Sequence, residues 1–205
     1  PAFIIQNIRD IKNPALINYL LERGINVNIA MHHCKEVSYL VNDKYYFAIG
    51  YKNDINGYEL RNKYFKGCTS KAPTTNGVGN DVCKVFEGFV DYLSYLTLKN
   101  TFHLQESSVV LNSVSNLEKA QSFIKSHNTI MTYLDNDEAG QRAISFLKSF
   151  GKNLIDKSSH YQNHKDLNDY LVNKNNLKNN LKNNLTDNID EGIKSEESNS
   201  YRRKR

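Results

Sequence analysis

The sequence predicts an α/β protein in which a mainly parallel sheet is flanked by helices and is preceded by a small α+β domain. From residue 82 to about residue 172, short apolar runs alternate with helical segments, a pattern typical of parallel strands joined by crossover helices. Residues 37–65 instead hold aromatic and β-branched runs separated by turn signals, as in antiparallel hairpins. Between these regions, residues 71–81 (KAPTTNGVGND) are rich in Pro, Gly, Thr and Asn and are predicted to be a linker.

Residues 1–70 are predicted to form the small N-terminal domain. The apolar residues of the segment 1–13 can share one helical stripe, so we expect a helix there. Pro14 then opens a second helix, for which Gly24 is the expected C-cap. Asn-Asp and Asn-Gly turn signals separate three expected antiparallel strands, which are Val37–Val41, Tyr45–Tyr51 and Tyr58–Phe65.

Residues 82–172 are predicted to form the second domain, whose sheet has about four strands. The expected strands are residues 82–86, 107–114, 129–134 and 153–156. The expected helices are Val90–Leu98, Leu117–Ser126, Ala139–Phe150 and a last helix that begins near His164.

Residues 173–205 are predicted to be an Asn/Lys-rich tail that is disordered or partly helical. The tail repeats KNNL three times in succession, and asparagine is a poor helix former. It ends in YRRKR, which either contacts phosphate or is simply solvated.

Composition limits the class of protein. Of 205 residues, 39% are hydrophobic and 24% are charged, as in a globular protein. No window approaches the roughly 20 apolar residues that a membrane span needs, so we expect no membrane partner. The net charge of +5 fits a polyanionic partner, although solubility explains it equally well. The sequence starts at Pro1 with no leader, so we expect a fragment or a processed chain.

The cysteines and the adjacent His32-His33-Cys34 do not indicate a metal site. Three cysteines without a CxxC pair support neither a disulfide framework nor a zinc ribbon, and we expect a reducing, cytoplasmic setting. No second pair of ligands follows His32 and His33 at zinc-finger spacing. We therefore expect no metal at these residues.

Two acidic segments lie where strands of the second domain lead into helices. Glu87 and Gly88 follow the strand 82–86, and Asp135 and Asp137 follow the strand 129–134, with Gly140 shortly after. The ends of parallel strands that lead into crossover helices lie at one edge of a sheet, so these acids are expected to meet. The two glycines are expected to let the backbone turn where a Cβ would obstruct it.

Clustered carboxylates repel one another unless a cation offsets their charge. Asp91 lies one helical turn beyond Glu87 and adds to the cluster. A few oxygen ligands suit Mg²⁺ or Mn²⁺, and the chemistry expected is phosphoryl transfer or phosphodiester cleavage with Glu87 free to move a proton. An acid that opens a helix is often only a favourable partner of the helix dipole, which would explain either segment alone. Two such segments on successive strand ends favour a site.

These residues resemble the Toprim domain, over roughly residues 82–170. EGFVD, residues 87–91, followed by YLDNDEAG, residues 133–140, is similar to the Toprim signature of Glu-Gly, a later Asp-x-Asp and Gly. The resemblance implies that Glu87, Asp135 and Asp137 are catalytic and that Asp135 and Asp137 hold metal, with Glu87 acting on the metal or as acid and base. The segment HKDLND, residues 164–169, resembles the end of the Toprim unit in primase-like members. It implies that Lys165 contacts phosphate and Asp166 metal, whereas the alternative is a helix capped by Asp166.

The N-terminal region resembles the part that precedes the Toprim unit in DnaG-type primases. There a Tyr-Leu-x-x-Arg-Gly helix, similar to YLLERG here, is followed by a small β region that ends in basic residues. The resemblance implies that Arg61, Lys63 and Lys66 line a basic groove for template and nucleotide phosphates. The interleaved Tyr58, Tyr64 and Phe65 either stack on bases or form cross-strand pairs.

The function expected from the resemblance is synthesis of RNA primers on single-stranded DNA by a Mg²⁺-dependent (or Mn²⁺-dependent) nucleotidyl transfer. The expected partners are single-stranded DNA and nucleotides, with a replicative helicase as a further candidate. The small size and Asn-rich tail resemble primase-like proteins of mobile elements. Two alternatives remain open, a metal-dependent Toprim nuclease and a non-catalytic DNA-binding module similar to RecR.

Overall fold

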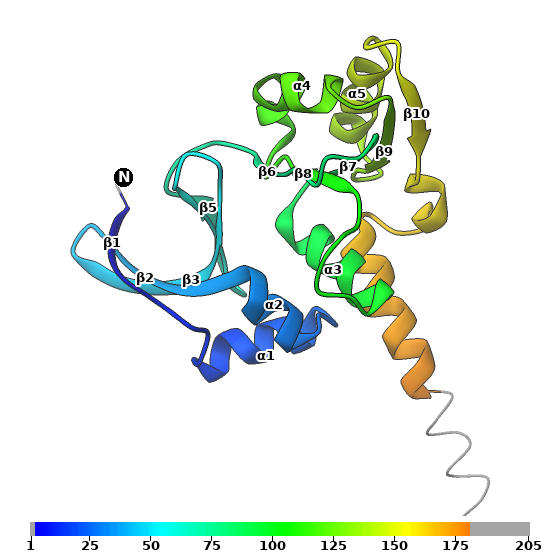
Figure 1. The fold of residues 1–205 in the computed structure, drawn as a ribbon. Helices are drawn as coiled ribbons and strands as arrows, with labels where there is room; N and C mark the ends of the chain where they lie inside the picture. The colour runs from blue at the N-terminus through cyan, green and yellow to red at the C-terminus, as the bar shows by residue number, and fades with distance from the viewer. Residues whose placement is uncertain (1–2, 181–205) are drawn as a thin grey trace, which may run out of the picture. The chain divides into compact units, whose positions relative to one another are not determined.

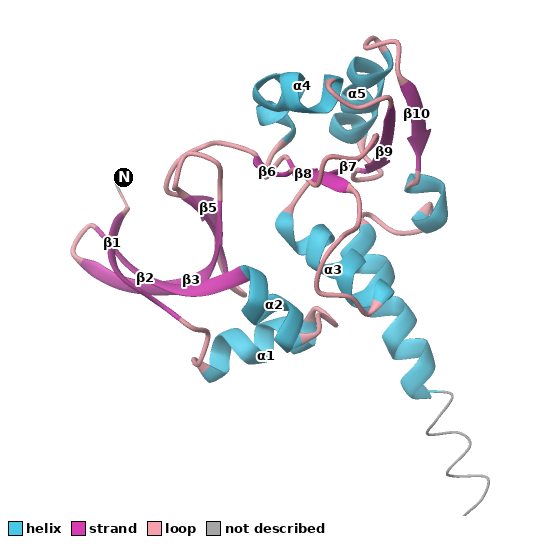
Figure 2. Ribbon diagram, in the orientation of Figure 1, coloured by secondary structure: helices cyan, strands magenta, loops and turns pink. Residues whose placement is uncertain are grey.

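The computed structural model describes residues 3–180. Two five-stranded sheets organise these residues, and Figures 1 and 2 show them with their helices. The first sheet has the order β1-β2-β3-β4-β5 and the second the order β10-β9-β7-β8-β6. This α/β architecture confirms the predicted fold class.

The first sheet is antiparallel throughout, with two short helices between its first two strands. Its strands are β1 (Ile4–Arg9), β2 (Cys34–Val41), β3 (Lys44–Lys52), β4 (Tyr58–Arg61) and β5 (Lys66–Cys68). The helices are α1 (Pro14–Glu22) and α2 (Val27–His33). Asparagines cap both helices, since Asn13 accepts from the Ala15 N–H and Asn26 from the Asn28 N–H.

Several predictions for this region are confirmed. Pro14 is the first residue of α1, and Gly24 follows the helix with a left-handed φ of 67°. The turn between β2 and β3 places Asn42 and Asp43 at φ values of 48° and 59°, as a two-residue hairpin of the predicted kind requires.

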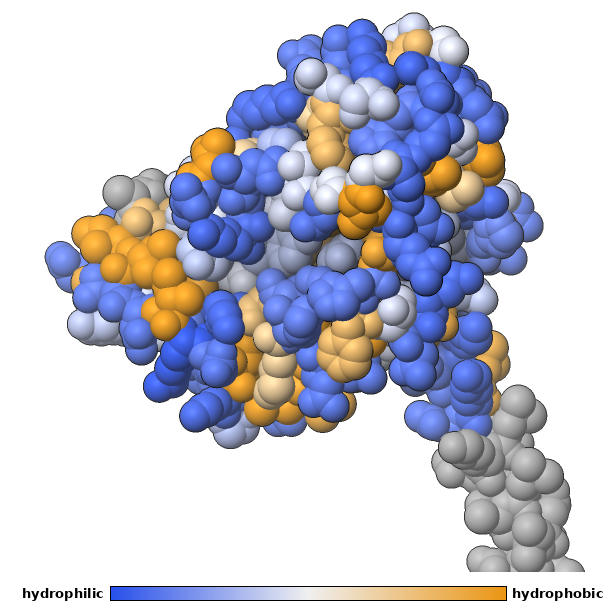
Figure 3. Space-filling view, in the orientation of Figure 1, coloured by the Kyte–Doolittle hydropathy of each residue, from blue (hydrophilic) through white to orange (hydrophobic). Residues whose placement is uncertain are grey.

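The helix predicted for residues 1–13 is wrong, because this segment forms β1. The strand pairs antiparallel with β2, from Ile4 opposite Leu40 to Arg9 opposite Glu36. Its β-branched isoleucines suit a strand, and pairing with β2 satisfies backbone groups that a short isolated helix would satisfy only weakly. Figure 3 shows hydrophobic residues gathered over this sheet, where Ile4, Ile5 and Ile8 remain exposed.

Two further differences concern the same region. The predicted strand Tyr58–Phe65 is broken, because β4 ends at Arg61 and a turn leads to β5. In that turn the Asn62 side chain accepts from the Tyr64 N–H. The helix α2 was not predicted, since its seven residues are too few for a clear helical period.

The second sheet carries four parallel strands, as predicted, and one antiparallel edge strand. The parallel strands are β7 (Val82–Phe86), β8 (Ser107–Val110), β9 (Thr129–Tyr133) and β10 (Asn153–Asp156). The connecting helices are α3 (Phe89–Lys99), α4 (Leu117–Lys125) and α5 (Glu138–Lys148). Short 3-10 turns lie at Val114–Asn116 and Ser158–Tyr161.

The predicted linker contributes a strand to this sheet. Within residues 71–81, β6 (Thr74–Asn76) pairs antiparallel with β8. The connector therefore forms one edge of the second sheet. The domain limits 1–70 and 82–172 stay predictions.

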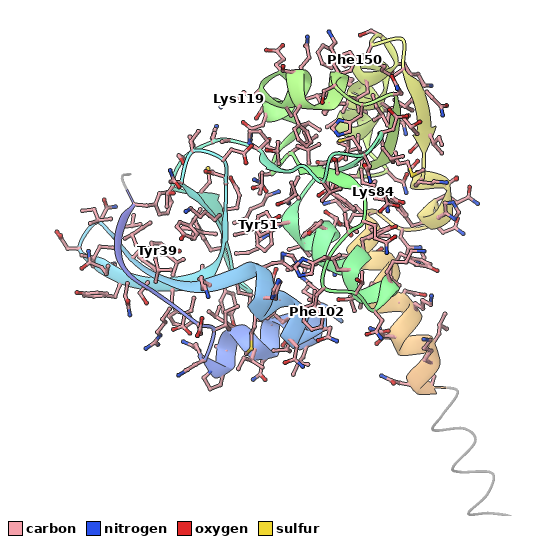
Figure 4. All side chains as sticks on the ribbon, in the orientation of Figure 1. Tyr39, Tyr51, Lys84, Phe102, Lys119 and Phe150 are labelled. Carbon is pink, nitrogen blue, oxygen red and sulfur yellow. The ribbon has the colours of Figure 1, made fainter. Side chains whose placement is uncertain are left out.

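Apolar residues cover both faces of the second sheet. On one face Leu117, Ile124, Ile144 and Leu147 of α4 and α5 pack against β7, β8 and β9. On the other, α3 packs together with α1, α2 and β3, and the Tyr51 ring of β3 stacks on Phe89 with centroids 5.3 Å apart (Figure 4). The first sheet is thus held beside the carboxyl edge of the second, where the predicted acids lie.

The chain separates into two units after Leu171. Residues 167–171 begin the predicted last helix in the first unit, and residues 172–180 of the second unit are helical. The tail prediction otherwise concerns residues 181–205, including the last KNNL repeat and YRRKR, which lie outside the described residues. Among the described helices, none combines the length and apolar character of a membrane span.

Candidate active site and metal centre

A pocket of about 350 Å³ lies at the carboxyl edge of the second sheet. Residues of the first sheet line one side, and the ends of β7, β8 and β9 line the other. Its charged lining residues are Arg23, Glu59, Arg61, Lys66, Glu87, Asp91, Asp135, Lys165, Asp166 and Asp169. With all of these groups ionised, the six carboxylates and four cations leave a net charge of two negative units, which one divalent cation would balance.

Sheet topology brings Glu87 and Asp135 together as predicted, although 48 residues separate them. The strands β7 and β9 are parallel neighbours, and Phe86 pairs with Tyr133 just before the two acids. The backbone N–H of Asp135 donates to Glu87 Oε2 at 3.2 Å. Strand order alone therefore explains their meeting.

Asp91, Asp135 and Asp166 form the tightest acidic group in the described part of the chain. One carboxylate oxygen from each lies within 4.8 Å of the other two. Asp91 comes from the first turn of α3 and is only 8% exposed. Asp166 caps the last helix, as the alternative prediction had it, because its Oδ1 accepts from the Asp169 N–H at 2.7 Å. Asp135 and Asp166 are half-buried. Three carboxylate oxygens this close fit a divalent cation, which would relieve their repulsion.

Electrostatics supports this interpretation. Burial, reinforced by the charges of Glu87 and Asp166, raises the pKa of Asp135 to about 7. Burial also raises the pKa of Asp91 well above its ordinary value, with further contributions from Asp166 and Asp135. The pKa of Glu87 is raised by burial, against a lowering by the Asp135 N–H. The pKa values of these neighbouring carboxyl groups are thus all raised, and a bound cation would lower them again.

The asparagine between the two aspartates holds the third acidic segment in place. Asn136 Nδ2 donates to the carbonyl oxygens of Tyr161 and His164, each at 2.9 Å. Its backbone N–H donates to the Lys165 carbonyl at 2.8 Å, and the Tyr161 hydroxyl donates to the Leu134 carbonyl. These bonds fix the loop that carries Lys165 and Asp166.

Asn168 holds the other side of the site and was not predicted. Its side chain is 1% exposed and donates to the Arg23 carbonyl and to Ser94 Oγ, each at 2.9 Å, while its Oδ1 accepts from the Arg23 guanidinium. Its backbone N–H donates to Asp91 Oδ1 at 3.3 Å. Asn168 therefore positions Asp91 and Arg23 together.

Asp137 and the two glycines have distinct positions. Asp137 is the N-cap of α5 and accepts from the Gly140 N–H at 2.9 Å, so it lies beside the pocket lining rather than within it. A Cβ at Gly140 would collide with the Asp135 carbonyl oxygen, and one at Gly88 would lie 3.3 Å from Asp91 Oδ2. Only at Gly140 is the obstruction a rigid backbone atom.

The predicted basic residues divide into two sets. Arg61, Lys66 and Lys165 line the pocket, whereas Lys63 is exposed and pairs with Glu22 at 2.9 Å on the surface. Arg23 joins the first set; it lies in the YLLERG segment, but its role was not predicted.

Glu59 is a second lining residue that the sequence did not indicate. It is buried, and burial raises its pKa to about 7 against the charges of Lys66 and Arg61. Asn112, Ser113 and Asp169 complete the polar lining. Asn112 and Ser113 lie in the turn after β8 and carry no signal in the sequence alone, whereas Asp169 lies in the last helix and ends the HKDLND segment, where it was given no role.

Two of the three aromatic residues near Arg61 and Lys66 have a packing role. Tyr58 and Phe65 pack against the core of the first sheet, and the Phe65 ring lies 5.9 Å from that of Phe3. Tyr64 is 90% exposed in the turn after β4.

The cysteines are free, as expected, and Cys34 is buried, with its pKa raised by burial. His32 and His33 close α2, and burial lowers the pKa of His33.

Two regions of the chain match known families. Residues 84–171 match a family described as Toprim-like. Residues 5–70 match a domain of unknown function, DUF8464. No curated protein sequence matches the chain significantly.

A solved primase structure shares this fold. The primase fragment of the bacteriophage T7 primase-helicase protein is 16% identical, with a TM-score of 0.57 over 85% of this chain and 78% of that one. A primase from Aquifex aeolicus, comprising its zinc-binding and RNA polymerase domains, is 15% identical, with a TM-score of 0.48 over 71% of this chain and 49% of that one. The family match identifies residues 84–171, which hold the acidic pocket at the carboxyl edge of β7 and β9, as a Toprim-like domain, and the fold of the chain resembles that of the T7 primase fragment.

Proposed function

We propose that this protein is a metal-dependent nucleotidyltransferase of the primase type, which makes RNA primers on single-stranded DNA. The observation that carries the proposal is a single pocket in which the oxygens of Asp91, Asp135 and Asp166 lie within 4.8 Å of one another and basic residues form the opposite wall. The primase-like fold supports it.

Asp91, Asp135 and Asp166 are the proposed ligands of Mg²⁺ or Mn²⁺, with Glu87 and Asp137 at the margin of the group. When bound, the ion supplies positive charge that polarises phosphate oxygens and offsets the charge that develops during transfer. Glu87 and Asp137 keep their predicted catalytic assignment as part of the proposal.

Glu87 is the proposed general base. It takes the proton of the primer 3′-hydroxyl as that oxygen bonds to the α-phosphorus of the incoming nucleotide and pyrophosphate leaves. Burial raises the Glu87 pKa, which brings a carboxylate closer to the pH at which it must accept a proton.

The basic wall is the proposed site for phosphates. Arg61 and Lys66 come from the first sheet, and Lys165 lies next to Asp166 in the chain; all three line the pocket and suit the triphosphate of a nucleotide and the template backbone. Arg23, held by Asn168, extends this wall. The T7 neighbour is part of a primase-helicase, so a replicative helicase is a reasonable partner to test.

The test is an assay with single-stranded DNA, ribonucleotides and Mg²⁺. We expect short RNA primers from the native protein and at least a hundredfold loss in Asp135→Asn, since one acid–base or electrostatic contribution is typically of that order. DNA binding should change little, because phosphate contacts come from lysine and arginine. Asp10→Asn, which removes a surface carboxylate paired with Lys35, is the control and should retain activity.

Two outcomes would contradict the proposal. Degradation of the template by the native protein, lost in Asp135→Asn, would assign a nuclease. DNA binding without turnover in either protein would indicate a non-catalytic binding module.

A further inference from the structure

Three of the six histidines of the chain gather at one place outside the pocket. His32 and His33 end α2, and His103 lies in the loop after α3, about 70 residues later in the sequence. The ring centroids of His32 and His103 are 4.7 Å apart, those of His32 and His33 are 5.0 Å apart, and those of His33 and His103 are 6.0 Å apart.

The backbone fixes the tautomer of one of these rings. His33 Nε2 lies 2.7 Å from the carbonyl oxygen of Phe102, which can only accept, so Nε2 carries the proton. In the neutral imidazole the lone pair is then on Nδ1. A ring N–H bonded to a backbone carbonyl is the usual arrangement of a metal-bound histidine, since it orients the ring and raises its basicity.

The other two rings are free to adjust. His32 and His103 are exposed, and the side-chain hydrogen bonds of the described residues leave both rings without a partner. The ring nitrogens of the three histidines lie farther apart than the carboxylate oxygens of Asp91, Asp135 and Asp166. The two exposed rings must therefore rotate before all three can bind one ion. Rotation of exposed side chains costs little compared with a metal–imidazole bond.

The sequence showed no ligand spacing at His32 and His33 and predicted no metal there, but the fold brings His103 beside them. We propose that His32, His33 and His103 form a binding site for a borderline transition-metal ion of the Zn²⁺ class. Neutral imidazole prefers Zn²⁺, Ni²⁺ or Co²⁺, whereas the carboxylates of the pocket suit Mg²⁺ or Mn²⁺. Three protein ligands leave a fourth position for water. This site is independent of the proposed function.

The ion would link two parts of the fold. Phe102 lies beside α2 where the chain leaves α3 (Figure 4), and the Tyr92 ring of α3 packs on His33 at 5.3 Å. A bound ion ties α2, which precedes the first sheet's main hairpin, to the α3 loop of the second. The site is therefore a structural clamp, and binding should stabilise the native state.

The test is titration of the full chain with Zn²⁺ by calorimetry and with Co²⁺ by absorption, in an Asp135→Asn background that disables the acidic pocket. We expect one Zn²⁺ per chain, a tetrahedral Co²⁺ spectrum and a higher melting temperature with Zn²⁺. His103→Ala should weaken Zn²⁺ binding at least about tenfold and remove the stabilisation. His160→Ala, at an exposed histidine elsewhere, should leave both unchanged.

The metal-free melting temperature shows whether each variant folds. If His103→Ala is destabilised without metal, His32→Ala replaces it, since His32 is also exposed. Absence of Zn²⁺ binding would overturn the proposal. So would a Zn²⁺ affinity in His103→Ala and His32→Ala equal to that of the protein with all three histidines. Zn²⁺ binding that appears only when Asp135 is restored would assign the ion to the acidic pocket and would overturn it as well.

Discussion

At the scale of single residues, the site depends on carboxyl groups whose environments make ionisation costly. Burial raises the pKa of Asp135 to about 7 and raises that of Asp91 well above its ordinary value. A single carboxylate buried in an apolar core without a partner would destabilise the folded state. Here several carboxyl groups line one polar pocket, where we propose that a divalent cation offsets their charge.

The shift of Asp135 predicts how stability depends on pH. Its pKa is 3.8 in an ordinary environment and about 7 when folded, so the folded state keeps the proton to higher pH. The contribution is fully present below pH 3.8 and is lost as pH rises through about 7. In metal-free buffer the melting temperature should therefore fall between pH 4 and 8 by more in the native protein than in Asp135→Asn.

Added Mn²⁺ should reverse this loss in the native protein alone, because the ion binds the ionised carboxylate. Calorimetric scans at several pH values, with EDTA or with Mn²⁺, measure both effects. Equal pH dependence in the two proteins would show that Asp135 titrates normally.

At the scale of elements, Gly140 shows why the turn after β9 has its sequence. The first turn of α5 passes so close to the Asp135 carbonyl that a Cβ has no room. Gly140→Ala should gain up to about 1 kcal/mol of helix propensity. The collision should outweigh that gain and lower the free energy of unfolding by about 1–3 kcal/mol.

Urea unfolding measures the change, and Mn²⁺ affinity should fall as well because Asp135 moves. Gly77→Ala is the matched control, since its nearest neighbour to a Cβ is the Phe123 ring at 3.6 Å, an ordinary contact. A stabilised Gly140→Ala protein would refute the close approach.

Most strands and helices of the second sheet could be predicted from the sequence, whereas two edge strands could not. From β7 to β10, every predicted strand and helix exists, and most of their bounds agree within two residues, because each apolar run and each helical period is bounded by its own turn residues. The exception is the strand predicted for residues 107–114, which ends at Val110. The strand β1 was not, since five apolar residues in a short segment fit either period and only pairing with β2 decides between them. The strand β6 lies in a turn-rich segment and exists because β8 offers it an edge.

The site was predictable where topology alone decides. Parallel strand ends bring Glu87 to Asp135 without knowledge of any contact. The roles of Arg23 and Asn168 depend on a hydrogen bond between residues 145 positions apart, which no local pattern reveals. Nothing in the sequence distinguishes Lys63 from Lys66. After the turn that follows β4, however, Lys66 lines the pocket and Lys63 pairs with Glu22 outside it.

At the scale of the molecule, the pocket combines Arg61 and Lys66 of the first sheet with Glu87 and Asp135, which follow β7 and β9 of the second. This division predicts that nucleic-acid affinity and metal binding are separable. For single strands each phosphate contact contributes about 0.7 to the slope of log affinity against log salt. Lys66→Ala should therefore weaken binding of single-stranded DNA and reduce that slope by about 0.7.

Fluorescence anisotropy across a salt series measures the slope. Lys63→Ala removes the same charge three residues away and should leave the slope unchanged, since Lys63 pairs with Glu22 outside the pocket. Equal effects of the two substitutions would mean that the basic wall is not the DNA path.

Acids from three separate segments line the pocket, and we propose that they hold one divalent ion. Anomalous diffraction from crystals grown with Mn²⁺ tests it most directly. We expect a single strong peak in the pocket within bonding distance of Asp91, Asp135 and Asp166, lost in Asp135→Asn crystals. An empty pocket at saturating Mn²⁺, or a peak that persists when Asp135 is replaced, would contradict the account.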